Sequence, residues 1–148
     1  MAHHYPNHHV SNNTIRQQHE RLHSLLEAIE NRFRHEQKPS RNLVSLLNAL
    51  AVHLQMHFEL EESDGLSRLV HQKPRLSAAV ERLLREHTDL QQEVNDLVTI
   101  AREDLAVNHD TANLAERFAK FHSKLVTHDH EENRLTQEAY NLDLGTKD

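Results

Sequence analysis

The sequence predicts an all-α protein, folded as an up-down-up-down antiparallel four-helix bundle. Apolar residues recur three and four positions apart in four long segments, which is the spacing of one face of an α-helix. The 148 residues include only 2 Gly and 3 Pro, too few for a β-sandwich or a glycine-rich phosphate loop. The breaks between the segments are short, and short connections favour antiparallel neighbours.

The first two predicted helices are separated by Pro39. Thr14 and Gln17 fit a capping box at the start of the first helix. Its inward face consists of Ile15, His19, Leu22, Leu26, Ile29 and Phe33. Pro39 disfavours helical geometry in the residue before it, and Ser40 can then cap the second helix. The inward face of that helix consists of Leu43, Leu46, Leu50, His53, His57 and Glu61.

A cluster of turn-forming residues, Ser-Asp-Gly at 63–65, is predicted to end or kink the second helix. A short turn or helix over 66–71 follows. Pro74 is suited to the first turn of a helix and starts the third long segment. The inward face of this segment consists of Leu76, Val80, Leu83, Leu84, His87, Leu90, Val94, Leu97 and Val98.

The fourth helix is predicted to follow a loop over 106–110. Asp110 or Thr111 can cap it, because either side chain can accept a hydrogen bond from the first turn. Its inward face consists of Leu114, Phe118, Phe121, Leu125, His128, Glu132 and Leu135. Four helices of roughly 20 to 30 residues each would be roughly 30 to 45 Å long.

Composition separates a leader from the helical domain and excludes several functional classes. Residues 1–13 carry four histidines without helical periodicity, so we expect a disordered His-rich leader before a single domain over 14–148. The chain has no Cys, which excludes disulfides, thiolate catalysis and iron–sulfur ligation. A net charge of −6 without a basic stripe argues against a nucleic-acid partner. No apolar run approaches about 18 residues, so we expect no membrane span and a cytoplasmic protein.

Two histidine–carboxylate pairs carry the functional prediction. His57 precedes Glu61 by four residues, and His128 precedes Glu132 by four. Residues four apart share one face of a helix, so each pair directs an imidazole and a carboxylate to the same side. Each pair is preceded by one histidine on the inward face of the previous long helix. Six side chains therefore form the predicted metal site: His19, His57, Glu61, His87, His128 and Glu132.

The positions of the loops predict that these side chains meet. Residues equidistant from the connecting loop lie at the same height in an antiparallel hairpin. The midpoint between His19 and His57 is residue 38, beside the first break, and the midpoint between His87 and His128 falls inside the 106–110 loop. The chain is thus an internal repeat of two helical hairpins, in which the segment QQHERL of the first hairpin corresponds to REHTDL of the second. One three-residue set would serve each of two metals, with the carboxylates free to bridge.

The residue types restrict the metal. Imidazole suits iron, zinc, copper or nickel, whereas carboxylates are hard ligands that can bridge two cations. A mixture without sulfur favours iron or manganese over a structural tetrahedral zinc. Six ligands shared between two metals leave coordination positions for oxo, hydroxo or water bridges and for an exogenous ligand.

Residues beside the six have two possible roles. His53 lies one turn before His57 and can be either a further ligand or an outer hydrogen-bond partner. His23 flanks the inward face of the first helix and is a weaker candidate for the same roles. Glu62 and Glu131 point about 100° away from their neighbours Glu61 and Glu132, and we expect both on the solvated surface. Three phenylalanines are expected in the core or in the wall of a dry pocket: Phe58, Phe118 and Phe121.

These motifs resemble the hemerythrin-like family, the HHE cation-binding domains. HLQMHFELEESDGL is similar to the second helix of that family, HDHEENRLTQEAYNLDLG to the fourth, and His19 and His87 fit the first and third. The resemblance runs from about residue 14 to the end of the chain. It implies a four-helix bundle that holds two Fe ions in a non-haem di-iron centre, with Zn or Mn as alternatives. Members variously bind O2, sense oxygen or redox state, respond to nitric oxide or peroxide, or handle iron.

One departure from the family narrows this expectation. Hemerythrins that carry O2 have an extra histidine one turn before the third-helix ligand, where this chain has Leu83. Simple oxygen transport is therefore disfavoured, and a protein that binds or senses O2, another small diatomic molecule or peroxide, or handles iron, is favoured. Two alternatives stay open: a di-iron enzyme acting on peroxide, O2 or NO, and a bundle in which the metal is structural.

Overall fold

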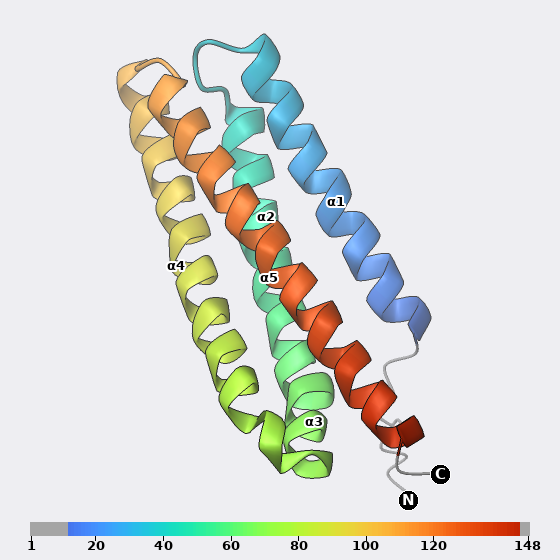
Figure 1. Ribbon diagram of the computed structural model, residues 1–148. Coiled ribbons are helices and arrows are strands. Elements are labelled where there is room, and N and C mark those ends of the chain that lie inside the picture. The colour runs from blue at the N-terminus through green and yellow to red at the C-terminus, as the bar shows by residue number, and fades with distance from the viewer. Residues whose placement is uncertain (1–11, 146–148) are drawn as a thin grey trace, which may run out of the picture.

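A computed structural model describes the chain over residues 12–145, with side chains over 16–139. Every described element is helical, and the long helices are α1 (Asn12–His35), α2 (Arg41–Leu60), α4 (Ser77–Val107) and α5 (Ala112–Gly145). They lie alongside one another in a bundle (Figure 1). Most of the predicted leader lies outside the described residues. Helix α1 begins at Asn12, ahead of the predicted start at Thr14, whose side chain is also outside the described part.

Hydrogen bonds join the loop after α1 to the loop after α4. The backbone N–H of Thr111 donates to the Gln37 carbonyl (2.9 Å), and the Thr111 hydroxyl donates to the Glu36 carbonyl (3.1 Å). Lys38 Nζ donates to the Asn108 carbonyl at 2.8 Å. Both connections therefore lie at one end of the bundle, as Figure 1 shows. This arrangement places the two hairpins side by side, so that equal distances from the loops correspond to equal heights.

The ends of the helices follow from local residue chemistry. Ser40 caps α2 as predicted, because its Oγ accepts a hydrogen bond from the Leu43 N–H at 3.1 Å. Helix α4 extends to Val107, into the predicted loop, and ends at Asn108 in the left-handed conformation (φ 53°). Asparagine adopts this conformation more readily than most residues, which makes it a suitable C-cap. The Asp110 carboxylate accepts from the Ala112 N–H at the start of α5.

Residues 63–65 were predicted to end or kink the second helix; the α-helical geometry does stop just before them, at Leu60, but the chain does not leave the helix. The chain stays helical through η1 (Glu61–Leu66), a π-helix, and α3 (Ser67–Gln72). After a 3₁₀ turn, η2 (Pro74–Leu76), helix α4 begins, so the start near Pro74 is confirmed. Gly65 has a negative φ, and a Cβ added there would meet no atom within 4 Å, so neither the backbone nor the packing requires glycine. The wide π turn takes up an additional residue instead.

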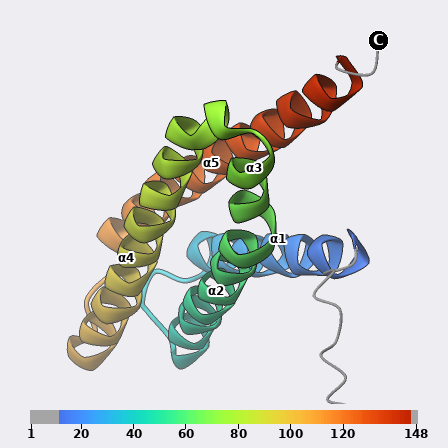
Figure 2. The same cartoon turned by 90° about the horizontal axis from the view of Figure 1, so that it is seen from below.

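Two apolar clusters fill the bundle, and a layer of histidines separates them. The larger cluster runs from the loop end to Phe58, and the smaller one comprises Leu66, Leu76, Val80, Leu83, Leu135 and Ala139. His57, His87 and His128 are each at most 2% exposed. Helix α2 packs on α1 and α4, and α4 packs on α5, whereas α1 and α5 share few contacts. Figure 2 shows that α1 does not run parallel to α4 and α5.

The sequence was expected to contain no segment that could span a membrane. Among the described residues, however, the continuous helical stretch Arg41–Gln72 is long and apolar enough to do so by length and composition. Its apolar residues include Leu43, Leu47, Leu50 and Leu54, which have no exposed surface in the bundle. These four leucines pack in the core between α1 and α4, whereas Val52 and Met56 on the same stretch are more than half exposed.

Candidate metal centre

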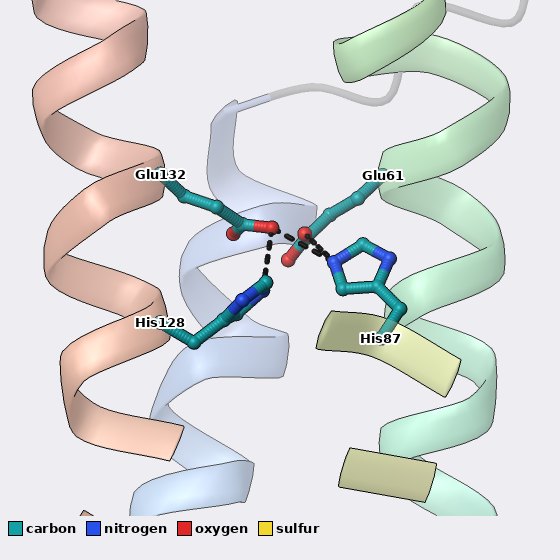
Figure 3. A group of neighbouring side chains, drawn as sticks. All are labelled: Glu61, His87, His128 and Glu132. Atoms are coloured by element: carbon teal, nitrogen blue, oxygen red, sulfur yellow. Dashed lines mark hydrogen bonds and ion pairs between the residues drawn. The ribbon is translucent and has the colours of Figure 1, made fainter. Parts of the chain in front are cut away.

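Four ligand-type side chains meet in the histidine layer. Glu61, His87, His128 and Glu132 each contribute one ligand-type atom to a group in which all such atoms lie within 4.8 Å of one another. Figure 3 shows the Glu132 carboxylate between the two imidazoles. Its Oε1 lies 2.9 Å from Nε2 of His87 and 2.9 Å from Nε2 of His128. Glu61 Oε2 lies 3.3 Å from the same His87 nitrogen.

A second group shares one residue with the first. It consists of His19, His57 and Glu61, again with ligand atoms within 4.8 Å of one another. Nε2 of His57 contacts Oε1 of Glu61. The two groups therefore hold all six side chains of the predicted site, and Glu61 is positioned to serve both. Glu132 belongs only to the four-residue group.

The heights agree with the loop-midpoint prediction. The ring centroids of His19 and His57 lie 4.8 Å apart, and those of His87 and His128 also lie 4.8 Å apart. Both pairs have edge-on rings, at interplanar angles of 63° and 62°. The two hairpins thus present matching pairs of imidazoles to the centre of the bundle, which is the symmetry expected from the repeat.

His53 and His23 lie outside both groups. His53 Nε2 donates a hydrogen bond to the Gln18 backbone carbonyl at 2.9 Å, which ties α2 to α1. His23 lines a cavity of about 300 Å³ between α1 and α5. His19, Asp129 and His130 line the same cavity, so one wall of it is formed by a residue of the three-residue group. His53 therefore lies outside the two groups and links two helices, whereas His23 lines the cavity that also reaches His19.

Glu62 lies at the surface, as predicted, but it also contacts His87. Its Oε1 accepts a hydrogen bond from Nδ1 of His87 at 3.1 Å, although the side chain is 42% exposed. The cause is the π-helix, which begins at Glu61 and changes the angle between successive side chains. Glu131, by contrast, pairs with Arg134 at 3.0 Å on the surface, as predicted.

Two further partners of the histidines were not predicted. Gln18 Oε1 accepts from Nδ1 of His57 at 3.2 Å, and Glu86 Oε1 lies 3.5 Å from Nδ1 of His128. Each of them adjoins one of the six in the sequence, at His19 and His87. A residue next to a ligand in the sequence lies about 100° around the helix, where it can face a neighbouring helix. This position beside a ligand was the signal from which the two partners could have been predicted.

Phe58 forms part of the centre as well as part of the core. Its ring stacks on His87 with centroids 3.9 Å apart and an interplanar angle of 10°. It also meets the edge of His128, at 5.7 Å. Phe118 and Phe121 are buried in the larger cluster, where core packing was predicted for them. Phe58 therefore covers the histidine layer on the side that faces the loops.

The comparison with known families agrees with the motifs. The sequence pattern of the family described as "Hemerythrin HHE cation binding domain" matches residues 10–139, which is most of the chain. The protein belongs to the hemerythrin family. No curated protein and no solved structure that was compared gave a match.

The residues of this hemerythrin domain suit a bound cation. His57 Nε2 and Glu61 Oε2 are buried without a hydrogen-bond partner of good geometry among the described residues. Such orphaned atoms are costly unless something else satisfies them. Two carboxylates and four imidazoles without sulfur are ligands for borderline and hard metals. A cation between the side chains would satisfy both orphaned atoms, so the donor set fits the metal binding of the family.

Electrostatics within the hemerythrin site are dominated by its carboxylates. Burial lowers the pKa of His87, but the adjacent carboxylates of Glu132, Glu61 and Glu62 outweigh burial and raise the pKa to about 10. Burial lowers the pKa of His128 as well, but the hydrogen bond to Glu132 outweighs burial, so this pKa is also raised. Glu61 shows the converse: burial raises its pKa, but the neighbouring histidines hold it well below the usual range. Without metal, protons occupy the positions between these groups.

The metal-free protein should lose stability as the pH rises from about 6.5 to about 10. The His87 pKa is 6.5 when unfolded and about 10 when folded, so the folded state binds the extra proton throughout this window. The free energy of unfolding then falls by up to about 1.4 kcal/mol per pH unit. Urea unfolding of the chelator-treated protein across the window measures this slope. A His87→Asn variant should give a flatter profile, and a wild-type profile without slope would contradict the prediction.

Proposed function

We propose that this hemerythrin domain is a non-haem di-iron protein that binds or senses O2 or a related small ligand. The observation that carries the proposal is the pair of ligand groups, of four and three residues, joined through Glu61. A carboxylate common to both groups can bridge two cations and offset part of their mutual repulsion. The donor set of nitrogen and oxygen, without sulfur, supports iron, with manganese or zinc as alternatives.

Each residue has a place in this proposal. His87, His128 and Glu132 would hold one metal, His19 and His57 the other, and Glu61 both. In this proposal the four long helices form the up-down-up-down bundle that the loop positions predict, and the joined loops support that order. Iron, when bound, would supply the redox chemistry and the attachment point for a small exogenous ligand. The expectations of a cytoplasmic location and of no nucleic-acid partner remain predictions from composition.

The surroundings of the site support sensing or iron handling over oxygen transport. Leu83 occupies the position at which oxygen carriers have an additional histidine, and it is 1% exposed in the smaller cluster. An apolar, fully packed side chain there supplies no ligand. The three-residue group has fewer protein ligands than the other and adjoins the cavity lined by His19. A small ligand can therefore approach that group between α1 and α5.

One observation favours an enzyme as the second candidate. Asp129 lines the same cavity as His19, and burial together with the Glu132 charge raises its pKa to about 6. A carboxyl group with such a pKa can exchange protons near neutral pH, as a general acid does. Turnover of peroxide or NO by the iron-loaded protein would favour this enzyme over the proposed binding protein.

Elemental analysis of protein purified without oxygen, followed by O2 titration with visible spectra, tests the proposal. We expect two Fe per chain and an oxygen-dependent spectrum that reverses under vacuum. A Glu61→Ala variant should lack most of the metal, and Glu131→Ala, which changes a surface carboxylate, should retain it. Zinc that changes the melting temperature without any redox chemistry would support a structural metal instead and overturn the proposal.

A further inference from the structure

The three buried histidines of the centre turn the same nitrogen inward. Nε2 of His57 lies beside Glu61, and Nε2 of His128 lies beside Glu132. Nε2 of His87 lies beside both carboxylates. The outer nitrogen, Nδ1, faces a different oxygen in each case. For His87 this is the Glu62 carboxylate at 3.1 Å, and for His57 the neutral Gln18 amide at 3.2 Å. His128 Nδ1 makes no hydrogen bond to the described residues, although Glu86 lies 3.5 Å away.

Consecutive residues of one helix thereby bracket a single imidazole. Glu61 lies at Nε2 of His87 and Glu62 at Nδ1 of the same ring. In a regular α-helix successive side chains point about 100° apart and do not contact the same group in this way. The π-helix that starts at Glu61 makes the arrangement possible. Wide turns of this kind occur frequently at functional sites, because they redirect one side chain without ending the helix.

We propose that Glu62 is a positioning residue that holds the proton of His87 on Nδ1 and so presents Nε2 to a metal. This inference rests on the proposed function. A carboxylate on the outer nitrogen fixes the ring orientation and makes the imidazole a better donor to a cation. Phe58 holds the face of the same ring, stacked at 3.9 Å, so His87 is constrained in both tilt and rotation.

The two halves of the centre differ as a result. In the four-residue group, an anion assists His87 from outside, and a second anion lies near His128. In the three-residue group, His57 has only a neutral amide. A carboxylate behind an imidazole makes the ring a better donor to a cation. The four-residue group therefore holds its metal more tightly, and removal of metal by a chelator proceeds from the three-residue group first.

Competition between the protein and a chromophoric chelator for Zn(II) tests the inference with four substitutions: Glu62→Ala, Glu62→Gln, Glu86→Ala and Glu131→Ala. Glu62→Ala should weaken the tighter metal site by roughly 10- to 100-fold, the usual effect of losing an outer partner. Glu62→Gln keeps an acceptor oxygen without the charge and should give a smaller loss. Glu131→Ala removes a carboxylate that also adjoins a ligand glutamate but pairs with Arg134, and it should match the wild type. Imidazole ¹⁵N spectra of the Zn(II)-loaded protein should show the His87 Nδ1 proton altered only in the Glu62 variants.

The outcomes separate this inference from the proposed function. If the wild type binds no metal, the proposed function fails before any variant is compared. If the wild type binds two Zn(II) and Glu62→Ala matches Glu131→Ala in affinity and in the ¹⁵N spectrum, Glu62 has no positioning role. Equal losses in Glu62→Ala and Glu62→Gln would contradict positioning by the hydrogen bond, because glutamine keeps the acceptor oxygen. A loss for Glu86→Ala as large as that for Glu62→Ala would contradict the dependence on the hydrogen bond.

Discussion

Replacing Phe58 with alanine should lower the free energy of unfolding by about 3 to 5 kcal/mol. The side chain is 4% exposed, belongs to the larger cluster, and stacks on His87. Its removal leaves a cavity between the apolar core and the histidine layer, and the surrounding helices can close it only in part. Urea or thermal unfolding of the metal-free protein, with Val107→Ala as the exposed control, measures the loss.

Phe58→Ala should also weaken metal binding. Without the phenyl ring, His87 loses the surface that holds its plane, and water can enter beside it. We therefore expect Phe58→Ala to weaken metal binding in the four-residue group more than in the three-residue group. Phe58→Leu fills most of the volume and should recover stability but not the stacked geometry. A loss of stability below about 1 kcal/mol, the scale of an ordinary point substitution, would show that the ring carries little of the packing.

The two ligand glutamates should have unequal effects on metal content. Glu61 belongs to both ligand groups, whereas Glu132 belongs to one. If the proposed di-iron function is right, Glu132→Ala should reduce the iron content from two per chain to one, and Glu61→Ala should reduce it further. Each loss of affinity should exceed the roughly 10- to 100-fold effect of losing an outer partner. Iron analysis after equilibration with a weak chelator measures both.

Stability of the metal-free variants provides an independent check on this comparison. His87 and His128 both contact Glu132 Oε1. Removing the Glu132 carboxylate therefore leaves the positive charge of these buried histidines without a partner. Breaking a buried pair in this way costs roughly 3 to 5 kcal/mol. Glu132→Gln keeps the volume and should restore packing without restoring metal. Identical iron contents for Glu61→Ala and Glu132→Ala would contradict the sharing of Glu61.

Local patterns were enough to predict most of the helical boundaries. Ser40 and Pro74 are placed by their own chemistry, as a cap and as a first-turn residue, and that chemistry needs no tertiary partner. The Ser-Asp-Gly cluster at 63–65 indicated an end or a kink, and the structure shows a change from α- to π-helical geometry in place of an end. Leu66 is buried on the far side, which favours continuing the helix through a wide turn.

The family membership and the six ligand candidates depend on spacing along the chain, and spacing can be read from sequence. Residues four apart share a face of a helix, and equal distances from a loop give equal heights in a hairpin. These two rules bring His19, His57, His87 and His128 to one layer, where their rings meet in pairs at 4.8 Å. Neither rule needs any knowledge of how the helices are rotated.

The outer partners of the histidines were decided only by the tertiary structure. Whether the exposed Glu62 also reaches His87 depends on the exact number of residues in one turn, and the π-helix changes that number. Whether His53 reaches a metal or the Gln18 carbonyl depends on the approach of α1 to α2. Periodicity determines which residues point inward, because it is a property of one helix. The choice among inward partners is made by the rotation and distance between helices, which the packing of the whole core sets.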